Sequence, residues 1–367
     1  MSPTAALCLV WVRLSAVGSQ VNPPTTHNPP SPTDSGSIEH ITEPVQRDLE
    51  RVEALLLERT DSIAPMIRQV GGYTFDGGGK RIRPLLALLS ASMCGYRGPR
   101  IIKVAAAGEF LHTASLVHDD VVDGAEARRG RDSVNQRFGS RVAVLVGDFM
   151  LATCSELLVE DGSLEVLGSY AESIRKMAEG EVLQLTNSFD PSMSETLYLQ
   201  IIGCKTATLI ATAAESGAIL ADVSRAQVRA VREFGWQLGI AFQLVDDALD
   251  YASSSAELGK ARLADVREGK VTLPLLYALS RCSVGERDSI GSQLKEFSLQ
   301  RLADTEPDGD ALERVVSAVE RHKGVELTLE RAAECTRQAR KQIESFPGSD
   351  SKAALAALCD FVVRRRH

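Results

Sequence analysis

The sequence predicts an all-α fold, on three observations. Apolar residues early in the chain recur at helical spacing with charged residues between them, as at Val45, Leu49, Val52, Leu55 and Leu56. Strand signals are scarce, because Val and Ile rarely alternate with polar residues. Runs rich in Ala, Leu and Glu are separated by Gly. Together these patterns indicate a helical bundle.

The composition limits the domain organisation and the partners. The chain has 367 residues, 44% of them hydrophobic, so it can bury a large core as one big domain or two ordinary ones. A net charge of −8 argues against a nucleic-acid partner, which would need a basic face. Seven cysteines without a CxxC pair indicate reduced thiols in a cytosol-like compartment. No run approaches the length needed to span a bilayer, so we expect no transmembrane segment.

Residues 1–37 are predicted to form a disordered leader, and residues 38–367 the folded domain. The leader is rich in Pro, Ser, Thr and Asn, which do not favour a packed element. It has no acidic residue before Asp34, as in a mitochondrial transit peptide, but Arg13 is its only Arg. A plain tail and an over-long start are the alternatives. We therefore expect a cytoplasmic protein, or a mitochondrial one if the leader is a transit peptide.

The first break in the helical pattern is a glycine-rich turn at residues 76–79, which Lys80 and Arg81 follow. Glycines let backbone amides approach an anion, and Pro84 suits the first turn of the next helix. The GxxxxGK[ST] spacing of a Walker loop is absent. A flexible loop with solvated charges is the alternative. Three cations directly after three glycines, Arg83 being the third, favour a phosphate site.

The first acidic motif lies in the stretch EFLHTASLVHDDVVD. On a helix, Asp119, Asp120 and Asp123 fall within about 100° of arc, and His112 lies about 20° from Asp119. Three carboxylates on one face repel each other, but they suit a hard cation that shares its oxygen ligands with a substrate phosphate. A solvated acidic helix end is the alternative. Three arginines follow directly: Arg128, Arg129 and Arg131. Acids for a metal followed by guanidiniums for a phosphate predict a magnesium-bridged diphosphate.

The same spacing recurs late in the chain. Asp246, Asp247 and Asp250 repeat the first motif, and Gln243 falls on their face of the helix. Two such motifs in one chain are much less expected by chance than one, and both follow apolar helical runs. The sequence therefore predicts two acidic helices that face each other.

Three lysines near these motifs are candidate phosphate ligands. Lys205 is a lone Lys in an otherwise apolar helix, where an unpaired ammonium is costly, so it is expected to face a ligand. A lysine that extends to solvent is the alternative. Lys260 and Lys270 each follow a Gly shortly after the second acidic motif, as suits a diphosphate site.

Eight motifs resemble, in order, those of the trans-isoprenyl diphosphate synthase family. They are GGGKRIRP, EFLHTASLVHDDVVD, ARRG, GDF, AEGEVLQL, CKTATL, GIAFQLVDDALDY and LGK…EGKVTLPLL. The resemblance covers about residues 45–360 and is strongest to the long-chain branch, such as octaprenyl diphosphate synthases. It implies a single large helical bundle of the isoprenoid synthase type, with a central cavity between two Asp-rich helices. It also implies a homodimer, for which the apolar run 141–158 is a candidate contact surface.

The resemblance implies roles for individual residues. Mg²⁺ ions, for which Mn²⁺ can substitute, would be held on the allylic diphosphate by Asp119, Asp120, Asp123, Asp246, Asp247 and Asp250. The allylic substrate itself would be contacted by Arg128, Lys205, Thr206, Gln243, Lys260 and Lys270. The second substrate, isopentenyl diphosphate, would be bound by Lys80, Arg81, His112 and Arg129. The six aspartates and Lys205 are the candidate catalytic residues. The loop before Lys270 departs from the family pattern, with Leu263 where Gly is usual and Ala264 where an acid is frequent.

The helix of the first acidic motif also bears on product length. Ser115 lies one turn beneath Asp119, about 6 Å deeper, with Ala114 beside it and Leu111 a further turn down. In short-chain members of the family, bulky aromatic residues form a floor there. Because the residues under Asp119 are small, we expect a product of about C35–C50, as in quinone side chains, and such a product seeks membranes.

Three alternatives remain open. A short-chain synthase that makes farnesyl or geranylgeranyl diphosphate would carry the same motifs. A non-catalytic regulatory subunit is the second alternative, but such subunits lose acidic or basic residues from these motifs, and none is lost here. A terpene cyclase is the third, and both DDALD and GGGKRIRP argue against it.

Overall fold

The computed structural model describes residues 38–75, 79–128, 130–252, 263–303, 305 and 307–364. Within these ranges nearly every element is a helix, and the strands form a single short hairpin, in which β1 (Ala127–Arg128) pairs antiparallel with β2 (Arg131–Asp132). The all-α class predicted from the sequence is therefore confirmed. The expected leader, residues 1–37, lies outside the described residues.

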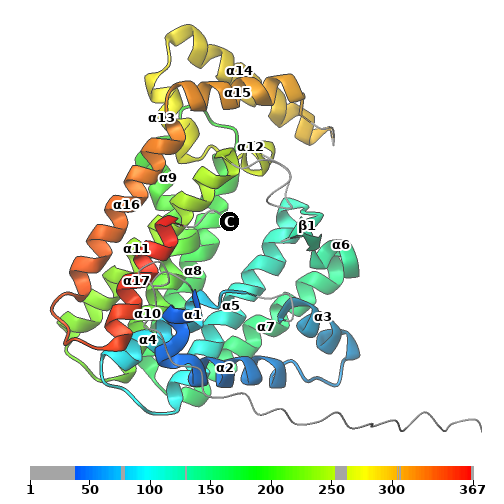
Figure 1. Ribbon diagram of the computed structural model, residues 1–367. Helices are drawn as coiled ribbons and strands as arrows, with labels where there is room; N and C mark the ends of the chain where they lie inside the picture. Colours follow the sequence, from blue (N-terminus) through cyan, green and yellow to red (C-terminus); the bar gives the residue numbers. More distant parts are fainter. Residues whose placement is uncertain are drawn as a thin grey trace, which may run out of the picture.

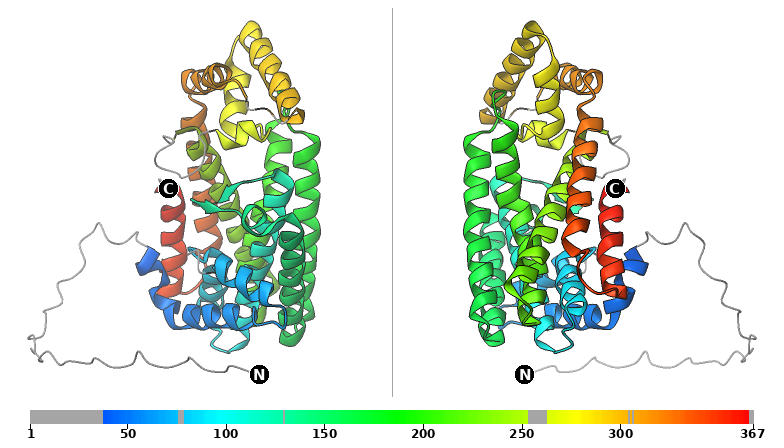
Figure 2. Two further views of the ribbon diagram at one scale, coloured as in Figure 1. Left: turned by 90° about the vertical axis from the view of Figure 1, so that its right-hand side faces the viewer. Right: turned by 90° about the vertical axis from the view of Figure 1, so that its left-hand side faces the viewer.

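Long helices form a bundle whose buried apolar side chains make one continuous core (Figure 1). Helix α11 packs against α10 and α16, and α5 packs against α4 and α7. Two side views show long helices running along the height of the molecule (Figure 2). The bounds are α4 Ile82–Met93, α5 Arg100–Asp123, α7 Ser140–Asp161, α8 Leu164–Thr186, α10 Thr208–Leu220, α11 Arg225–Ala252, α16 Gly324–Ile343 and α17 Asp350–Arg364.

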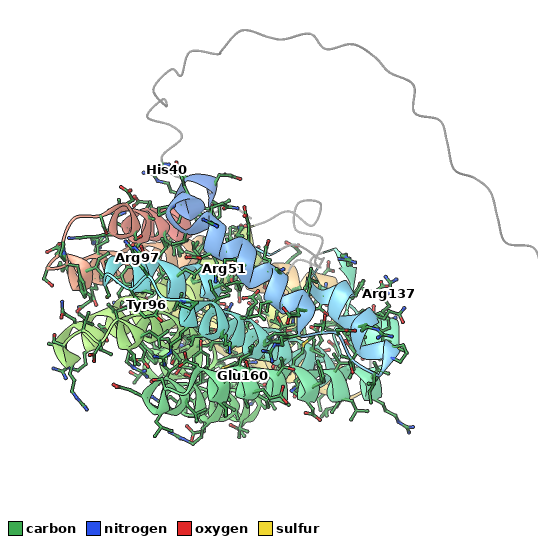
Figure 3. All side chains as sticks on the ribbon, turned by 90° about the horizontal axis from the view of Figure 1, so that it is seen from below. His40, Arg51, Tyr96, Arg97, Arg137 and Glu160 are labelled. Carbon is green, nitrogen blue, oxygen red and sulfur yellow. The ribbon has the colours of Figure 1, made fainter. Side chains whose placement is uncertain are left out.

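Short elements close the lower end of the bundle in Figure 1. They are α1 Ile38–Thr42, η1 Glu43–Val45, α2 Gln46–Glu58 and α3 Pro65–Phe75. The view from below shows α2, labelled at Arg51, lying across the ends of longer helices (Figure 3). Arg59, just after α2, donates two hydrogen bonds of 2.8 Å to the carboxylate of Glu160 in α7. This ion pair joins the lower elements to the bundle.

Further helices lie at the upper end of the molecule (Figure 1). They are α12 Ala264–Arg267, α13 Leu273–Arg281, α14 Val284–Leu302 and α15 Gly309–Arg321. The guanidinium Nη2 of Arg301 in α14 donates to the carbonyl oxygen of Asp123, at 3.4 Å, so this end contacts the last residue of α5. The remaining short elements are α6 Val134–Phe138, α9 Glu195–Ile202 and the π-helical turn η2 Gly203–Ala207.

Two glycines let α11 pack closely against α10 and η2. An added Cβ would lie 2.7 Å from the Cα of Ala211 at Gly235, and 2.6 Å from the Cα of Ala207 at Gly239. A larger residue at either position would push α11 away from its neighbours. Gln243 follows one turn later, so these glycines also set the position of the second acidic motif.

Two helical segments are long and apolar enough to cross a membrane, by length and composition alone. They are Ser140–Asp161, with a mean hydropathy of 1.9, and Glu195–Leu220, with 1.3. The expectation that no run reaches this length is therefore wrong: α7 reaches it alone, and α9, η2 and α10 join into one continuous helix in spite of Lys205. Both segments also belong to the packed bundle, with 44% of the first and 67% of the second buried, so length and composition are weak grounds for a membrane span.

Candidate active site

The first acidic motif occupies the last turn of α5, as predicted. The helix ends at Asp123, and Gly124 follows with a φ of 69°, a left-handed conformation that suits glycine, its N–H bonded to the carbonyl of Asp120. Burial raises the pKa of Asp119 to about 6, and Lys205 opposes that shift. Removing this carboxylate from water disfavours its negative charge, so the site favours an added cation.

Asp120 is held by an arginine from the hairpin that follows α5. It is only 2% exposed, and its Oδ1 accepts from Arg128 at 2.8 Å (Nε) and 2.6 Å (Nη2). The hairpin reverses the chain immediately after the motif and thereby returns the guanidinium to its carboxylate. Arg128 therefore lies at the first acidic motif, as predicted.

Lys205 reaches the first acidic motif from the π-helical turn η2. Its Nζ forms an ion pair with Glu181 of α8 and lies 3.9 Å from Oδ2 of Asp119. π-Helical turns are rare and occur often at functional sites. Gly180 lets α8 approach this turn, because an added Cβ there would lie 2.8 Å from the backbone N of Lys205. Neither the π-helical turn nor the Glu181 contact was foreseen, since sequence periodicity does not distinguish π from α turns.

Lys270 reaches the same motif from the loop before α13. Its Nζ lies 3.2 Å from Oδ2 of Asp123 and also pairs with Glu268. Burial by itself lowers the pKa of this ammonium, but Glu268, Asp265 and Asp123 outweigh burial and raise it above its usual value. Lys270 is therefore held charged beside the motif.

The second acidic motif lies near the end of α11, and Asp247 is its most buried member, at 2% exposed. Oδ1 of Asp247 accepts from Nε2 of Gln243 at 2.8 Å, and Oδ2 accepts from the hydroxyl of Tyr198 in α9. Gln243 in turn accepts from Oγ1 of Thr206, at 2.8 Å. Burial, and next the nearby charge of Asp265, raise the pKa of Asp247 well above its usual value. Tyr198 was missed because it stands in an apolar run that reads as core.

Asp250 fixes the start of α12. Its two carboxylate oxygens accept from the backbone N–H groups of Ala264 and Asp265, each at 3.2 Å. Leu263, where the family pattern has glycine, adopts a left-handed φ of 63°. Leu263 thus adopts a backbone conformation that suits the family's glycine. Asp250 anchors Ala264 and Asp265, which follow it.

A cavity of about 90 Å³ lies beside the second acidic motif. Its charged and amide walls are Gln184, Asn187, Lys205, Gln243, Asp247, Asp265 and Lys270. Its apolar walls include Met193, Ile201, Ile202 and Val271. Because Lys205 and Lys270 line this cavity and also contact Asp119 and Asp123, the two acidic motifs meet at one site. A larger open hollow of about 480 Å³ lies beside η1 and α2, at the lower end of the molecule.

Three of the four residues expected to bind the second diphosphate lie among the described residues. Arg81 is 11% exposed and points inward, where its Nη1 lies 3.1 Å from Glu109 and its Nη2 donates to the carbonyl of Phe75 at 2.8 Å. The ammonium of Lys80 lies 5.1 Å from the ring centre of Phe361. His112 is half-buried on α5. The side chain of Arg129, the fourth predicted ligand of this diphosphate, lies outside the described residues, as does Lys260, which was predicted to contact the allylic substrate.

The donor set fits a hard divalent cation that shares its ligands with a phosphate. Among the described residues, no three His, Cys, Asp or Glu side chains come close enough to hold a metal ion by themselves. Mg²⁺ is commonly bound by one or two carboxylates plus substrate phosphates rather than by a protein cage. The raised pKa of Asp119 marks a carboxylate that an added cation would stabilise. Protein donors already occupy Asp120 and Asp247.

Sequence comparisons with known proteins show which family this chain is similar to. Residues 64–304 match the family model described as polyprenyl synthetase. The chain is 39% identical over 334 residues to octaprenyl diphosphate synthase of Haemophilus influenzae, a match covering 91% of this chain and 99% of the relative. It is 36% identical to all-trans-nonaprenyl-diphosphate synthase (geranyl-diphosphate specific) of Rhodobacter capsulatus, over 89% of this chain and 97% of the relative.

Solved structures give the same result for the fold. The crystal structure of polyprenyl synthase from Caulobacter crescentus, complexed with calcium and isoprenyl diphosphate, aligns with a TM-score of 0.84 and 39% identity, over 92% of this chain and 100% of that chain. A decaprenyl diphosphate synthase from Rhodobacter capsulatus aligns with a TM-score of 0.83 and 37% identity, over 90% and 100%. The bundle with two Asp-rich helices is thus the isoprenoid synthase fold.

Proposed function

We propose that this chain, which belongs to the polyprenyl synthetase family and is a prenyltransferase, makes a long-chain all-trans polyprenyl diphosphate. The proposed reaction is the head-to-tail condensation of isopentenyl diphosphate onto an allylic diphosphate such as farnesyl diphosphate. One observation carries the proposal: Lys205 and Lys270 join the two acidic motifs around one cavity. Two acidic motifs with cations between them suit a diphosphate and its metal ions.

The metal would be held by carboxylates of both acidic helices. We propose Asp119 and Asp123 on α5, with Asp246 and Asp250 on α11, as Mg²⁺ ligands, with Mn²⁺ as a substitute. When bound, the metal neutralises diphosphate charge and makes the diphosphate a better leaving group. Asp120 and Asp247, whose oxygens accept from Arg128, Gln243 and Tyr198, orient the helix ends that carry these ligands.

The chain's own residues bind and shield the reacting groups. Lys205 and Lys270 would exchange their carboxylate contacts for oxygens of the allylic diphosphate as it leaves. The resulting allylic carbocation would lie near the side-chain oxygens of Thr206 and Gln243, which are weak electron-pair donors. The apolar side chains of Ile201 and Ile202 would also line its position. Apolar walls exclude water, which would otherwise quench the cation before the alkene of isopentenyl diphosphate attacks. The proton lost in this step would go to the released diphosphate, so no protein group is proposed as the base.

The proposed product of about C35–C50 rests on the small residues beneath Asp119. Ser115 is half-buried, and its Oγ donates to the carbonyl of His112 at 2.8 Å, so the side chain lies against its own helix. Ala114 and Leu111 are buried. The relatives named above make octaprenyl and nonaprenyl chains, in agreement with this proposal. Geranylgeranyl pyrophosphate synthase of Bacteroides thetaiotaomicron, with a TM-score of 0.74 and 32% identity, keeps the short-chain alternative open.

Product chromatography tests the long-chain assignment. Purified chain is incubated with farnesyl diphosphate, labelled isopentenyl diphosphate and Mg²⁺, and the dephosphorylated product is separated by length. We expect about C35–C50 from the native chain and a shorter product from Ser115→Phe, because the phenyl ring would narrow the path one turn below Asp119. A C15 or C20 end product from the native chain would refute the long-chain assignment and leave the enzyme class intact.

The proposed assembly is a homodimer that pairs through the outward face of α7. Val144, Leu145 and Val159 are exposed on this helix by 40%, 67% and 65%. Apolar residues gathered on one outer face favour a protein contact. Sedimentation should find a dimer at micromolar concentration, and an active monomer there would contradict this proposal. We propose the cytoplasm as the site of action, or the mitochondrion if residues 1–37 act as a transit peptide, and a quinone side chain as the use of the product.

A further inference from the structure

We propose that His118 of α5 is a positioning residue for the first acidic motif. Its ring holds the last turns of α5 against α7 and so sets where the carboxylates of Asp119 and Asp123 lie. The inference rests on the proposed function, since those two carboxylates are proposed there as Mg²⁺ ligands. It also gives a role to the GDF motif at residues 147–149, which the proposed reaction does not use.

His118 joins the end of α5 to α7. It comes directly before Asp119, and successive residues of a helix point about 100° apart, so its ring leaves the face that carries Asp119. Nε2 of His118 lies 3.1 Å from the carbonyl oxygen of Val144 and 3.6 Å from Oδ1 of Asp148, both on α7. With its hydrogen on Nε2, the neutral ring donates to the Val144 carbonyl. The imidazole therefore links the acidic end of α5 to a neighbouring long helix.

Gly147 provides the space for this ring. An added Cβ at Gly147 would lie 2.2 Å from Nε2 and 2.5 Å from Cδ2 of His118, closer than atoms that are not bonded approach each other. Gly147 is buried in the interior of α7, where glycine is less favourable than alanine. Contact with the imidazole gives a physical reason for glycine at this position. The ring thus rests directly on the backbone of α7.

The bond to Val144 and the fit on Gly147 do most to hold the ring. The side chain of His118 is 33% exposed and that of Asp148 is 60% exposed, and exposed ion pairs contribute little. The Val144 carbonyl belongs to the backbone of a packed helix, so it cannot turn away as a surface side chain can. Arg128 also contacts this end of α5, but it comes from the hairpin that directly follows the helix. His118 instead ties the motif to a separate helix of the bundle.

A small rotation of α5 would misplace both carboxylates. A carboxylate on a helix lies about 5–6 Å from the helix axis, so a rotation of about 20° moves it by about 2 Å. Mg²⁺ holds its oxygen ligands at about 2.0–2.1 Å in a near-octahedral arrangement. Asp119 and Asp123 also lie 3.9 and 3.2 Å from the ammonium groups of Lys205 and Lys270, which come from other elements. An anchor that fixes the rotation of α5 therefore fixes the aim of both carboxylates.

Removal of the ring tests the inference through metal affinity. Mn²⁺ binding to the native chain, His118→Ala and His118→Gln is measured by electron paramagnetic resonance, with an unreactive thiolo analogue of farnesyl diphosphate present. We expect His118→Ala to bind Mn²⁺ about tenfold more weakly and to lower kcat by a similar factor, because loss of a group that orients metal ligands typically costs about ten- to a hundredfold. KM for isopentenyl diphosphate should stay unchanged. His118→Gln keeps an N–H donor at a similar reach and should recover most of the affinity.

Gly147→Ala tests the same contact from α7. The added methyl group would displace the imidazole, so we expect the Mn²⁺ affinity to fall as in His118→Ala. In the double variant of His118→Ala with Gly147→Ala the ring is already absent, and the second substitution should cause no further loss. Gly168→Ala is the matched control, because Gly168 also lies within a helix, α8, and nothing lies within 4 Å of its added Cβ. This variant should bind Mn²⁺ like the native chain.

The outcomes separate this inference from the proposed function. Native Mn²⁺ affinity in His118→Ala would overturn the inference, even with a lower melting temperature, because the ring would then serve only stability. Losses that add in the double variant would also overturn it, since the two residues would then act separately. A native chain that binds no Mn²⁺ and condenses nothing would instead contradict the proposed function.

Discussion

The two acidic motifs have the same spacing, but the first motif and Asp247 of the second are held by different kinds of partner. On α5, basic side chains from elsewhere in the chain contact all three carboxylates: Arg128 at Asp120, Lys205 at Asp119 and Lys270 at Asp123. On α11, the buried Asp247 accepts from the uncharged donors Gln243 and Tyr198. A lysine that pairs with a carboxylate can exchange that carboxylate for another anion, such as a diphosphate. Buried hydrogen bonds from neutral donors instead hold a carboxylate in one position. The first motif thus resembles a site ready to exchange partners, and Asp247 a fixed support.

The largest expected effect follows from removing a proposed metal ligand from either motif. We expect Asp119→Ala and Asp246→Ala each to lower kcat by several orders of magnitude, because metal binding and activation of the leaving group are lost together. Rates are measured with labelled isopentenyl diphosphate at saturating Mg²⁺. If only one of the two variants lost activity, the two motifs would not act on one diphosphate.

Removing an exchangeable lysine should have a smaller effect. Lys205→Ala and Lys270→Ala each delete one charge-assisted contact, which costs roughly 1.5–3 kcal/mol, or about ten- to a hundredfold in KM for the allylic substrate. Lys103 is the matched control, because it forms an exposed ion pair with Glu160 at 2.9 Å. Lys103→Ala should leave both KM values unchanged. A rise in KM for isopentenyl diphosphate alone would reverse the assignment of the two lysines.

Removing the Tyr198 hydroxyl, a neutral donor to Asp247, tests the second side of the comparison between the two motifs. Tyr198→Phe leaves one oxygen of the buried Asp247 without its hydroxyl donor, so we expect about a tenfold loss in kcat/KM and a lower melting temperature. Tyr277→Phe is the control, since its hydroxyl makes only a 3.4 Å contact with Glu195. If Tyr198→Phe were as active and as stable as the native chain, the neutral donors would not be supporting the motif.

The smallest expected effect concerns an ion pair outside the site. Hydrogen bonds from Arg59, and then Lys103, lower the pKa of Glu160 to about 2. A carboxyl whose pKa is lower in the folded state contributes stability above its unfolded pKa of about 4.3, and this contribution is lost as the pH falls from there toward 2. Melting temperatures of the native chain and Glu160→Gln should therefore converge over that window. A constant gap between the two curves would exclude this titration.

Local patterns in the sequence were sufficient to predict the helices and residues that line the candidate site. Both Asp-rich helices, the arginine after the first, and the lone lysine in an apolar run follow from spacing and residue type. The partners of these groups depend on which elements meet in space. Glu181 stands in the AEGEVLQL motif, but spacing does not show that it pairs with Lys205, and Tyr198 stands in no motif that marks it as a partner of Asp247.

Arg81 shows what spacing leaves out about a predicted ligand. A cation directly after three glycines predicts a phosphate ligand, and the structure adds a contact of this guanidinium with Glu109, 28 residues later on α5. Glu109 stands in a run of small and apolar residues, and its position opposite Arg81 depends on how α4 and α5 pack. Sequence spacing gives the residue type at a site, whereas tertiary packing decides which protein groups that residue contacts.

The central claim is that this chain alone, with a divalent cation, condenses isopentenyl diphosphate onto an allylic diphosphate. The most direct measurement is the incorporation of labelled isopentenyl diphosphate by the purified full chain with farnesyl diphosphate, in Mg²⁺ and in excess chelator. We expect long-chain product in Mg²⁺, none in chelator, and recovery when Mg²⁺ or Mn²⁺ is restored. Full turnover in chelator would contradict the metal site, and no turnover with Mg²⁺ unless another subunit is added would contradict the claim that the chain is a complete enzyme.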